Sequence, residues 1–137
     1  MKKLLLIFTL LFSTLMFSTP SYAEWTKVSS TLNGAHTFYV DFDRIRKHGG
    51  YVYFWRLRDA LKQDPFGDFS SKSYYQGDCK LFRHKMLSSS FHKKPMGNGP
   101  GEVIKHTGHK HTGELAEWKH PPPNSSHEII LKRVCGQ

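Results

Sequence analysis

The densest group of metal-binding side chains in this 137-residue sequence is a histidine cluster near its C-terminal end. Its members are His106, His109 and His111, and His120 follows nine residues later. Neutral imidazoles bind Zn²⁺ or Cu²⁺, and two histidines separated by one residue share a face of a strand. No carboxylate stands inside the cluster as a fixed fourth ligand. The cluster is therefore interpreted either as a site for zinc, copper or haem, or as a solvated loop rich in histidine.

Acid–base catalysis by other histidines is a second hypothesis. In small basic exported ribonucleases, one histidine acts as the general base and another as the general acid. His36, His84 and His92 lie on expected strands, but their spacing does not require them to face one another. The sequence contains no Gly-x-Ser-x-Gly, His-Glu-x-x-His or Gly-Lys-Ser/Thr motif. We therefore expect no enzyme activity, with a histidine-dependent hydrolase or ribonuclease as the alternative.

Basic side chains on the expected strands are candidates for binding an anion. They are Arg56, Arg58, Lys72, Arg83 and Lys85. If the strands bring these residues onto one face, they form a patch for an anionic glycan or a phosphate group. Otherwise they are scattered over a solvated face. The formal net charge of +9 agrees with an anionic partner but does not choose among the classes of partner.

Residues 1–23 have the features of a cleavable signal peptide. A lysine pair and an apolar stretch lead to Ser21-Tyr22-Ala23, which supplies small residues for cleavage. The apolar stretch is about 14 residues long, shorter than the roughly 20 that span a membrane as a helix. We expect export to the periplasm or beyond, and one domain over 24–137 with no transmembrane segment. Glu24, not cysteine, follows the expected cleavage site, so no lipid anchor is expected.

Cys79 and Cys135 are the only cysteines of the sequence, and both lie in the part expected to be exported. In an oxidising compartment such a pair is most simply interpreted as one disulfide. Closing so long a loop is worth about 4 kcal/mol in the chain-entropy model, a large share of the stability of a small domain. The competing interpretation is a catalytic thiol, which would have to be exposed and easily ionised.

The side-chain pattern predicts a domain made mostly of β-strands. The expected strands cover 25–31, 36–42, 51–61, 69–80 and 81–91, with shorter ones at 103–104 and 116–118. Segment 51–61 is the strongest, because aromatic and β-branched residues favour a pleated surface. Its alternation places Tyr51, Tyr53, Trp55 and Leu57 on one face and Val52, Phe54, Arg56 and Arg58 on the other. Segment 43–47 is expected to form a single turn capped by Asp43.

The C-terminal end carries the one expected helix. Ser125 and Glu128 form a capping-box pattern, and apolar residues follow at helical spacing. A helix of fewer than three turns is not stable alone in water. A disulfide from Cys135 to Cys79 would hold it on the sheet.

A series of short motifs runs through residues 24–137. In chain order they are Trp25, the Phe-Tyr-Val-Asp segment at 38–41, Trp55, Ser71-Lys72-Ser73, Tyr75, Asp78-Cys79, Trp118 and Val134-Cys135. In this order and spacing they resemble the bacterial surface-adhesin protein E-like family. The resemblance implies an α+β fold that is mostly β. In it, a short C-terminal helix packs on the concave face of a curved antiparallel sheet of about six strands.

The same resemblance implies a non-catalytic binding function. Members named as adhesins bind extracellular-matrix and serum proteins, and some are homodimers. Two departures argue against display on the outer surface: Glu24 in place of a lipidation cysteine, and a Gly/His-rich stretch over 93–113. We expect an exported domain, in the periplasm or at the cell surface, whose partner is an unidentified protein or an anionic glycan.

Overall fold

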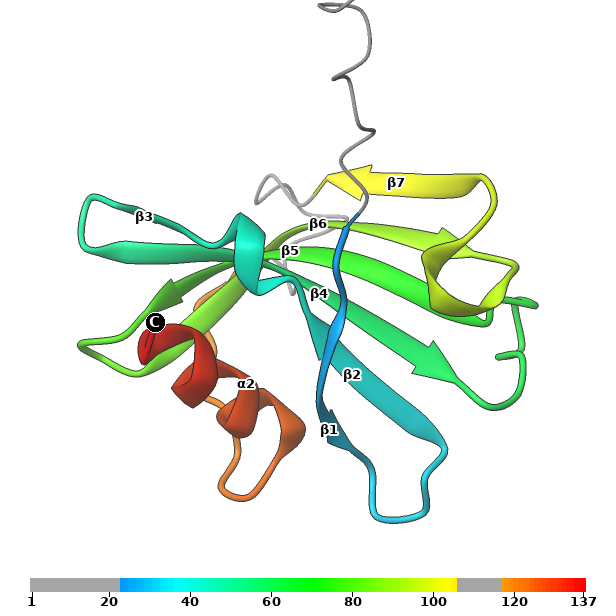
Figure 1. Ribbon diagram of the computed structural model, residues 1–137, viewed down its shortest axis with the longest axis horizontal. Helices are drawn as coiled ribbons and strands as arrows, with labels where there is room; N and C mark the ends of the chain where they lie inside the picture. The colour runs from blue at the N-terminus through cyan, green and yellow to red at the C-terminus, as the bar shows by residue number, and fades with distance from the viewer. Residues whose placement is uncertain (1–22, 106–116) are drawn as a thin grey trace, which may run out of the picture.

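The computed structural model describes residues 23–105 and 117–137 (Figure 1). Its strands are β1 (Thr26–Ser30), β2 (His36–Val40), β3 (Arg46–His48), β4 (Tyr51–Ala60), β5 (Ser70–Asp78), β6 (Arg83–His92) and β7 (Gly101–Lys105). Two 3₁₀ turns, η2 (Phe42–Arg44) and η3 (Pro95–Gly97), and the helix α2 (Ser126–Cys135) complete the described elements. None of the helices in these residues is long and apolar enough to cross a membrane.

The strands form one antiparallel sheet that does not close into a barrel. Its order is β1-β2-β4-β5-β6-β7, and β3 pairs with the first residues of β4 beside this path. The described residues thus contain seven strands where the family resemblance implies about six. The fold class expected from the resemblance is confirmed, with β3 as the additional strand.

The turn that follows β2 is capped by a different residue than the sequence predicts. The turn η2 is present, but Asp41 caps it: Asp41 Oδ1 accepts a hydrogen bond from the backbone N–H of Asp43 at 3.2 Å. Asp41 Oδ2 also accepts a hydrogen bond from Arg44 Nε at 2.6 Å. Asp43 is exposed, whereas Asp41 directly follows β2 at a buried position, next to the backbone N–H groups at the start of η2. The expectation that Asp43 caps the turn is therefore wrong.

The hydrophobic core lies between the concave face of the sheet and α2. It consists of Phe38, Val40, Val52, Phe54 and Tyr75 from the sheet and Ile130, Leu131 and Val134 from the helix. The alternation predicted for β4 is confirmed, since Val52, Phe54 and Arg56 are buried on this face. Gly77 lets the helix come close: a Cβ atom there would lie 2.9 Å from Val52 Cγ1 and 3.0 Å from Leu131 Cδ1.

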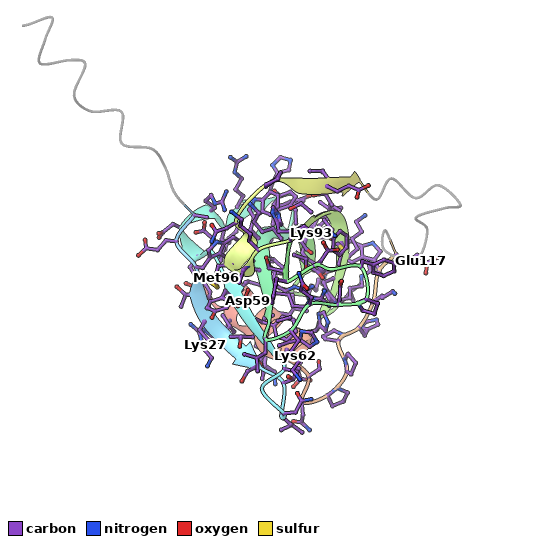
Figure 2. The ribbon with its side chains drawn as sticks, turned by 90° about the vertical axis from the view of Figure 1, so that its right-hand side faces the viewer. Lys27, Asp59, Lys62, Lys93, Met96 and Glu117 are labelled. Carbon is purple, nitrogen blue, oxygen red and sulfur yellow. A yellow bond between two sulfur atoms is a disulfide. The ribbon has the colours of Figure 1, made fainter. Side chains whose placement is uncertain are left out.

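The other face of the sheet carries a smaller cover. The turn η3 lies over it, so that Leu57 is fully buried and Gly97 sits against the side chains of Leu57 and Lys72. The backbone N–H of Met96 donates to Asp59 Oδ1 at 2.7 Å, and both residues can be followed in Figure 2. This cover leaves much of the remaining face, including Trp55 and its neighbours on β5, only partly buried.

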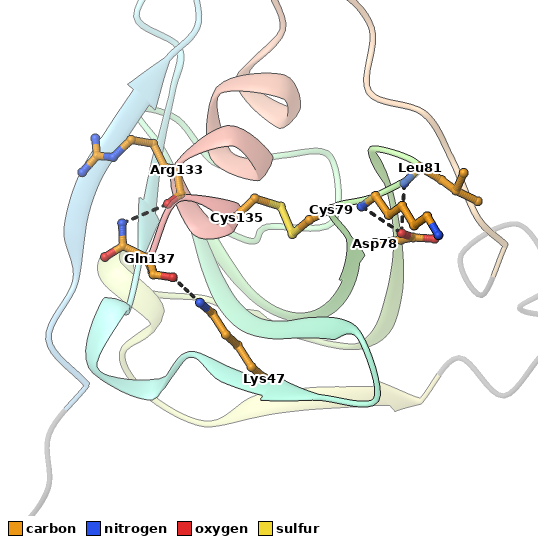
Figure 3. Close-up of a disulfide and its surroundings, with 8 residues drawn as sticks. Lys47, Asp78, Cys79, Leu81, Arg133, Cys135 and Gln137 are labelled. Carbon is orange, nitrogen blue, oxygen red and sulfur yellow. Dashed lines mark hydrogen bonds between the residues drawn. A yellow bond between two sulfur atoms is a disulfide. The ribbon is translucent and has the colours of Figure 1, made fainter.

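The helix α2 is held at both ends, as the sequence predicts. Ser125 caps its start, because its Oγ accepts a hydrogen bond from the N–H of Glu128 at 3.2 Å. At its end Cys135 forms the disulfide with Cys79, next to the last residue of β5 (Figure 3). The disulfide expected from the two cysteines is confirmed.

Replacing Leu131 by alanine is expected to lower the free energy of unfolding by about 2–4 kcal/mol, because the lost side chain leaves a cavity in the core. Leu131 is 1% exposed, whereas Ile129 on the same helix is 39% exposed. The matched control Ile129→Ala is therefore expected to cost less than about 1 kcal/mol. Urea denaturation followed by circular dichroism measures both values, and equal losses would contradict the helix face assigned here.

Replacing both cysteines by serine is expected to lower the free energy of unfolding by about 3–4 kcal/mol. The amides of α2 should then exchange with solvent faster than those of β4 and β5, because the helix loses its covalent attachment to the sheet. Urea denaturation and hydrogen exchange provide the two measurements. Reduction of the unmodified protein is the control and should reproduce the loss. A loss below about 1 kcal/mol would mean that packing alone holds the helix.

Candidate functional site

A cavity of about 450 Å³ opens beside α2, on the same side of the sheet as the core. It is called the helix-side cavity here. Its walls are Arg56, Tyr75, His84, Lys85, Met86, Glu117, Lys119, His120, Pro122 and His127. They come from β4, β5, β6, the segment 117–122 and α2. Residues far apart in the sequence therefore meet at this point.

Arg56 is the central side chain of the helix-side cavity. It is 7% exposed, and its guanidinium lies over the rings of Tyr75 at 4.8 Å and Phe38 at 5.4 Å. Its Nη1 donates to His127 Nδ1 at 3.1 Å, and its Nε has no hydrogen-bond partner among the described residues. Burial lowers the pKa of Arg56 from its ordinary value, yet an arginine stays charged in proteins. The site therefore holds a buried cation.

Two histidines stand beside this cation. The ring centroids of His84 and His127 are 5.3 Å apart, and His84 stacks on Tyr75 at 5.2 Å. Burial, followed by the charge of Arg56, lowers the pKa of each of these histidines to about 4. Because arginine can only donate, the Nδ1 atom of His127 is the acceptor and its proton resides on Nε2. Both rings are neutral at pH 7.

The outer wall of the cavity is a strap formed by residues 117–120 along the edge of β6. The backbone groups of Lys119 and His84 are paired, with N···O distances of 2.8 and 2.9 Å. Trp118 anchors the strap on the other side of the sheet, where its ring stacks on Tyr51 at 5.6 Å. The cations of Arg83 and Lys85 lie 4.6 and 4.8 Å from the Trp118 ring. Of the strand predicted at 116–118, residue 116 lies outside the described residues, residues 117 and 118 are not in a strand, and a single β-bridge forms at Lys119.

A second hollow, of about 460 Å³, lies on the face of the sheet that α2 does not cover. We define the aromatic surface as Trp25, Arg44, Trp55, Lys72 and Tyr74. Four of these residues line the hollow, and the ring of Tyr74 lies 4.8 Å from that of Trp55. The Arg44 guanidinium lies 5.6 Å above the Trp55 ring. Partly exposed aromatic rings and two cations therefore share this face.

The five basic residues that the sequence suggests as an anion patch are distributed over three places. Arg56 and Arg58 lie on the helix face of β4, and Arg56 lines the cavity. Lys72 pairs with Leu57 in register and belongs to the opposite face. Arg83 and Lys85 flank Trp118, and Lys85 also reaches the wall of the helix-side cavity. Of these five, the structure brings Arg56 and Lys85 together in one cavity.

The predicted histidine sites have different outcomes. His106, His109 and His111 lie outside the described residues, so the metal or haem site stays a prediction. His120 is described, and its Nδ1 lies 3.2 Å from the carbonyl oxygen of Phe82. No cluster of three metal-binding side chains occurs within residues 23–105 and 117–137.

His36, His84 and His92 do not form an acid–base pair. His92 lies on the face opposite His84, where it contacts Ser90 Oγ and the Gly99 carbonyl. His36 lies at the far end of the helix face, opposite Ala60. Of the three, His84 alone reaches the helix-side cavity.

His127 and Trp118 are site residues that the sequence reasoning missed. A signal for His127 exists: it precedes the core residues Ile130, Leu131 and Val134 by three, four and seven positions. This spacing places it on the buried face of an α-helix. Trp118 has no comparable signal, because its position follows from how the strap crosses the edge of β6.

The chain has relatives at the level of family and fold. A family model described as surface-adhesin protein E matches residues 25–136. Among curated proteins, no sequence matches this chain significantly.

Solved structures of Haemophilus influenzae protein E are similar to this chain in fold. Crystal form II has a TM-score of 0.57 at 13% identity, over 88% of this chain and 94% of that one. A second structure has a TM-score of 0.55 at 12% identity, over 86% and 88% of the two chains. The Se-Met form has a TM-score of 0.57 at 13% identity, over 88% and 93%. At this level of identity the likeness concerns the fold.

The free energy of unfolding is expected to fall as the pH is lowered from about 6.5 to about 4. In this range unfolded histidines take up protons, while His84 and His127 stay neutral in the folded protein because their pKa is about 4. We expect the two rings together to lower the free energy of unfolding by about 2 kcal/mol. This is less than the full pKa shifts would give, because solvent screens these half-buried groups.

Urea denaturation across this pH range, on the parent protein and the variant H84Q/H127Q, measures the effect. The variant should lose less stability than the parent, since the carboxylates and the other histidines titrate in both proteins. An identical pH dependence in the two proteins would contradict the assigned pKa values.

Proposed function

The chain belongs to the surface-adhesin protein E family, and from this premise we propose that it is an exported, non-catalytic domain that binds a protein partner. The observation that carries the proposal is the aromatic surface, where tryptophan, tyrosine and arginine side chains gather on an open sheet face. These three residue types dominate the energetic centres of protein–protein interfaces.

Charge indicates the kind of partner surface. Arg44 and Lys72 lie among the rings of the aromatic surface, and the whole chain has a formal net charge of +9. Complementary charge accelerates association and selects partners. We therefore propose an acidic patch on the partner. An anionic glycan, which would use the same cations, is the other outcome of the test below.

The chemistry of the helix-side cavity supports a binding role rather than catalysis. His84 and His127 both have a pKa of about 4. At neutral pH neither ring is protonated, so neither serves as a general acid, and a base with so low a pKa is weak. The pKa values of His84 and His127 are therefore too low for the general acid and general base of a ribonuclease at neutral pH.

The proposed location is outside the cytoplasm, in the periplasm or at the cell surface. The disulfide between Cys79 and Cys135 supports it, because disulfides persist in oxidising compartments. The signal peptide at 1–23 stays a prediction, and so do cleavage after Ala23 and the absence of a lipid anchor.

The double variant W25A/K72Q is expected to weaken binding to a protein partner at least about tenfold, since it removes one ring and one cation from the aromatic surface. The measurement is surface plasmon resonance of the exported chain on a panel of immobilised extracellular-matrix and serum proteins, with heparin as an anionic glycan. The matched control is L32A/K62Q, which removes a fully exposed leucine and an exposed lysine elsewhere.

Three results would overturn this proposal. The first is equal weakening by both double variants, which would make the effect nonspecific. The second is hydrolysis of single-stranded RNA by the purified protein that the substitution His84→Gln abolishes, which would make the protein an enzyme. The third is binding to heparin alone, which would assign the aromatic surface to a glycan instead of a protein.

A further inference from the structure

We propose that the helix-side cavity binds a small organic anion, a carboxylate or a phosphate carried on an apolar body, whose charge pairs with Arg56. This site lies on the other side of the sheet from the aromatic surface, and the proposal does not depend on the protein-binding function above. Its basis is a buried cation, a cavity of suitable size and a set of hydrogen-bond donors.

The first observation is that Arg56 has no counter-charge among residues 23–105 and 117–137. None of the ion pairs among the described residues involves it. Within the described residues its guanidinium lies against two aromatic rings and one neutral imidazole, and its Nε is buried without a hydrogen-bond partner. A buried charge is costly unless an opposite charge or enough hydrogen bonds compensate it. An anion in the adjoining cavity would supply that compensation.

The second observation is the charge of the cavity wall. Besides Arg56, Lys85 and Lys119 line it, and Glu117 is its one carboxylate among the described residues. Glu117 is exposed and forms no ion pair with any other described residue. The cavity therefore favours an anion over a cation or a neutral molecule.

The third observation concerns size and the remaining lining. About 450 Å³ lies within the range of small-molecule sites and exceeds the volume that a lone inorganic anion fills. Tyr75, Met86 and Pro122 provide apolar wall. His127 carries its proton on Nε2 and so adds a donor to this lining. An amphipathic anion would use both the cationic and the apolar parts.

The guanidinium is suited to this ligand by its preorganisation. The rings of Phe38 and Tyr75 and the bond to His127 hold Arg56 in one orientation. An arginine fixed in this way binds a carboxylate or a phosphate with little further loss of side-chain entropy. Arg58 provides a matched control: it shares the helix face, its Nε likewise has no hydrogen-bond partner in the described part of the chain, and it does not line the cavity.

The test is a titration by two-dimensional NMR of the ¹⁵N-labelled protein, purified from the periplasm of an expression host. The probes are benzoate, phenyl phosphate, inorganic phosphate and neutral benzamide at pH 7. We expect benzoate or phenyl phosphate to bind with a Kd below about 1 mM, and benzamide to bind at least about tenfold more weakly. Whichever of the two organic anions binds more tightly identifies the ligand as a carboxylate or a phosphate.

The variant Arg56→Gln is expected to weaken binding of the preferred probe at least about tenfold, and Arg58→Gln by less than about threefold. The variant His127→Gln provides a second measurement if Arg56→Gln does not fold, and should weaken binding about threefold or more. Equal effects of the two arginine variants would overturn the proposal. So would benzamide binding as tightly as benzoate, binding of inorganic phosphate alone, or no chemical-shift change with any probe up to about 10 mM.

Discussion

The docking of α2 on the concave face of the sheet is the constraint on which the rest of the structure depends. A ten-residue helix does not persist alone in water. It is stable here because Ile130, Leu131 and Val134 are buried against the sheet and because Cys135 is bonded to Cys79. The sheet depends on the helix in turn, since Val40, Val52 and Phe54 would otherwise face water. The core exists only when the two layers are together.

This docking also determines the surroundings of Arg56. The helix covers the end of the sheet face that carries Val52 and Phe54, and Arg56 follows on the same face as the third member of the alternation. His127, in the first turn of α2, then meets the guanidinium. An arginine that would be solvated on an isolated sheet is thereby buried, and the two neighbouring histidines become hard to protonate. The unusual electrostatics of the helix-side cavity are a consequence of the packing.

The two faces of the sheet consequently offer different chemistry. The helix side has a cationic cavity with neutral imidazoles, suited to a small ligand. The other side has partly exposed rings with Arg44 and Lys72 between them, suited to a broad partner surface. The protein-binding role proposed for the aromatic surface starts from membership of the surface-adhesin protein E family. The ligand proposed for the helix-side cavity is argued from that cavity's own residues.

The sequence by itself determined the local features of this protein. The alternation in β4, the capping of α2 by Ser125 and the pairing of the two cysteines each follow from neighbouring residues or from residue type. The order of the short motifs from Trp25 to Cys135 also indicated the family. The cap of η2 was assigned to Asp43 instead of Asp41, because two aspartates separated by one residue satisfy the same local rule.

Only the tertiary structure decided which residues share a site. A strand's side chains alternate with period two, so the sequence shows which residues share a face but not which face of the next strand they meet. Register joins Arg56 to Ser73, and Lys72 therefore lies on the opposite face from Arg56. His84 and His127 meet Arg56 because β6 and α2 both border the cavity beside the middle of β4. Such meetings depend on pairing and docking between distant segments, and no spacing along the chain encodes them.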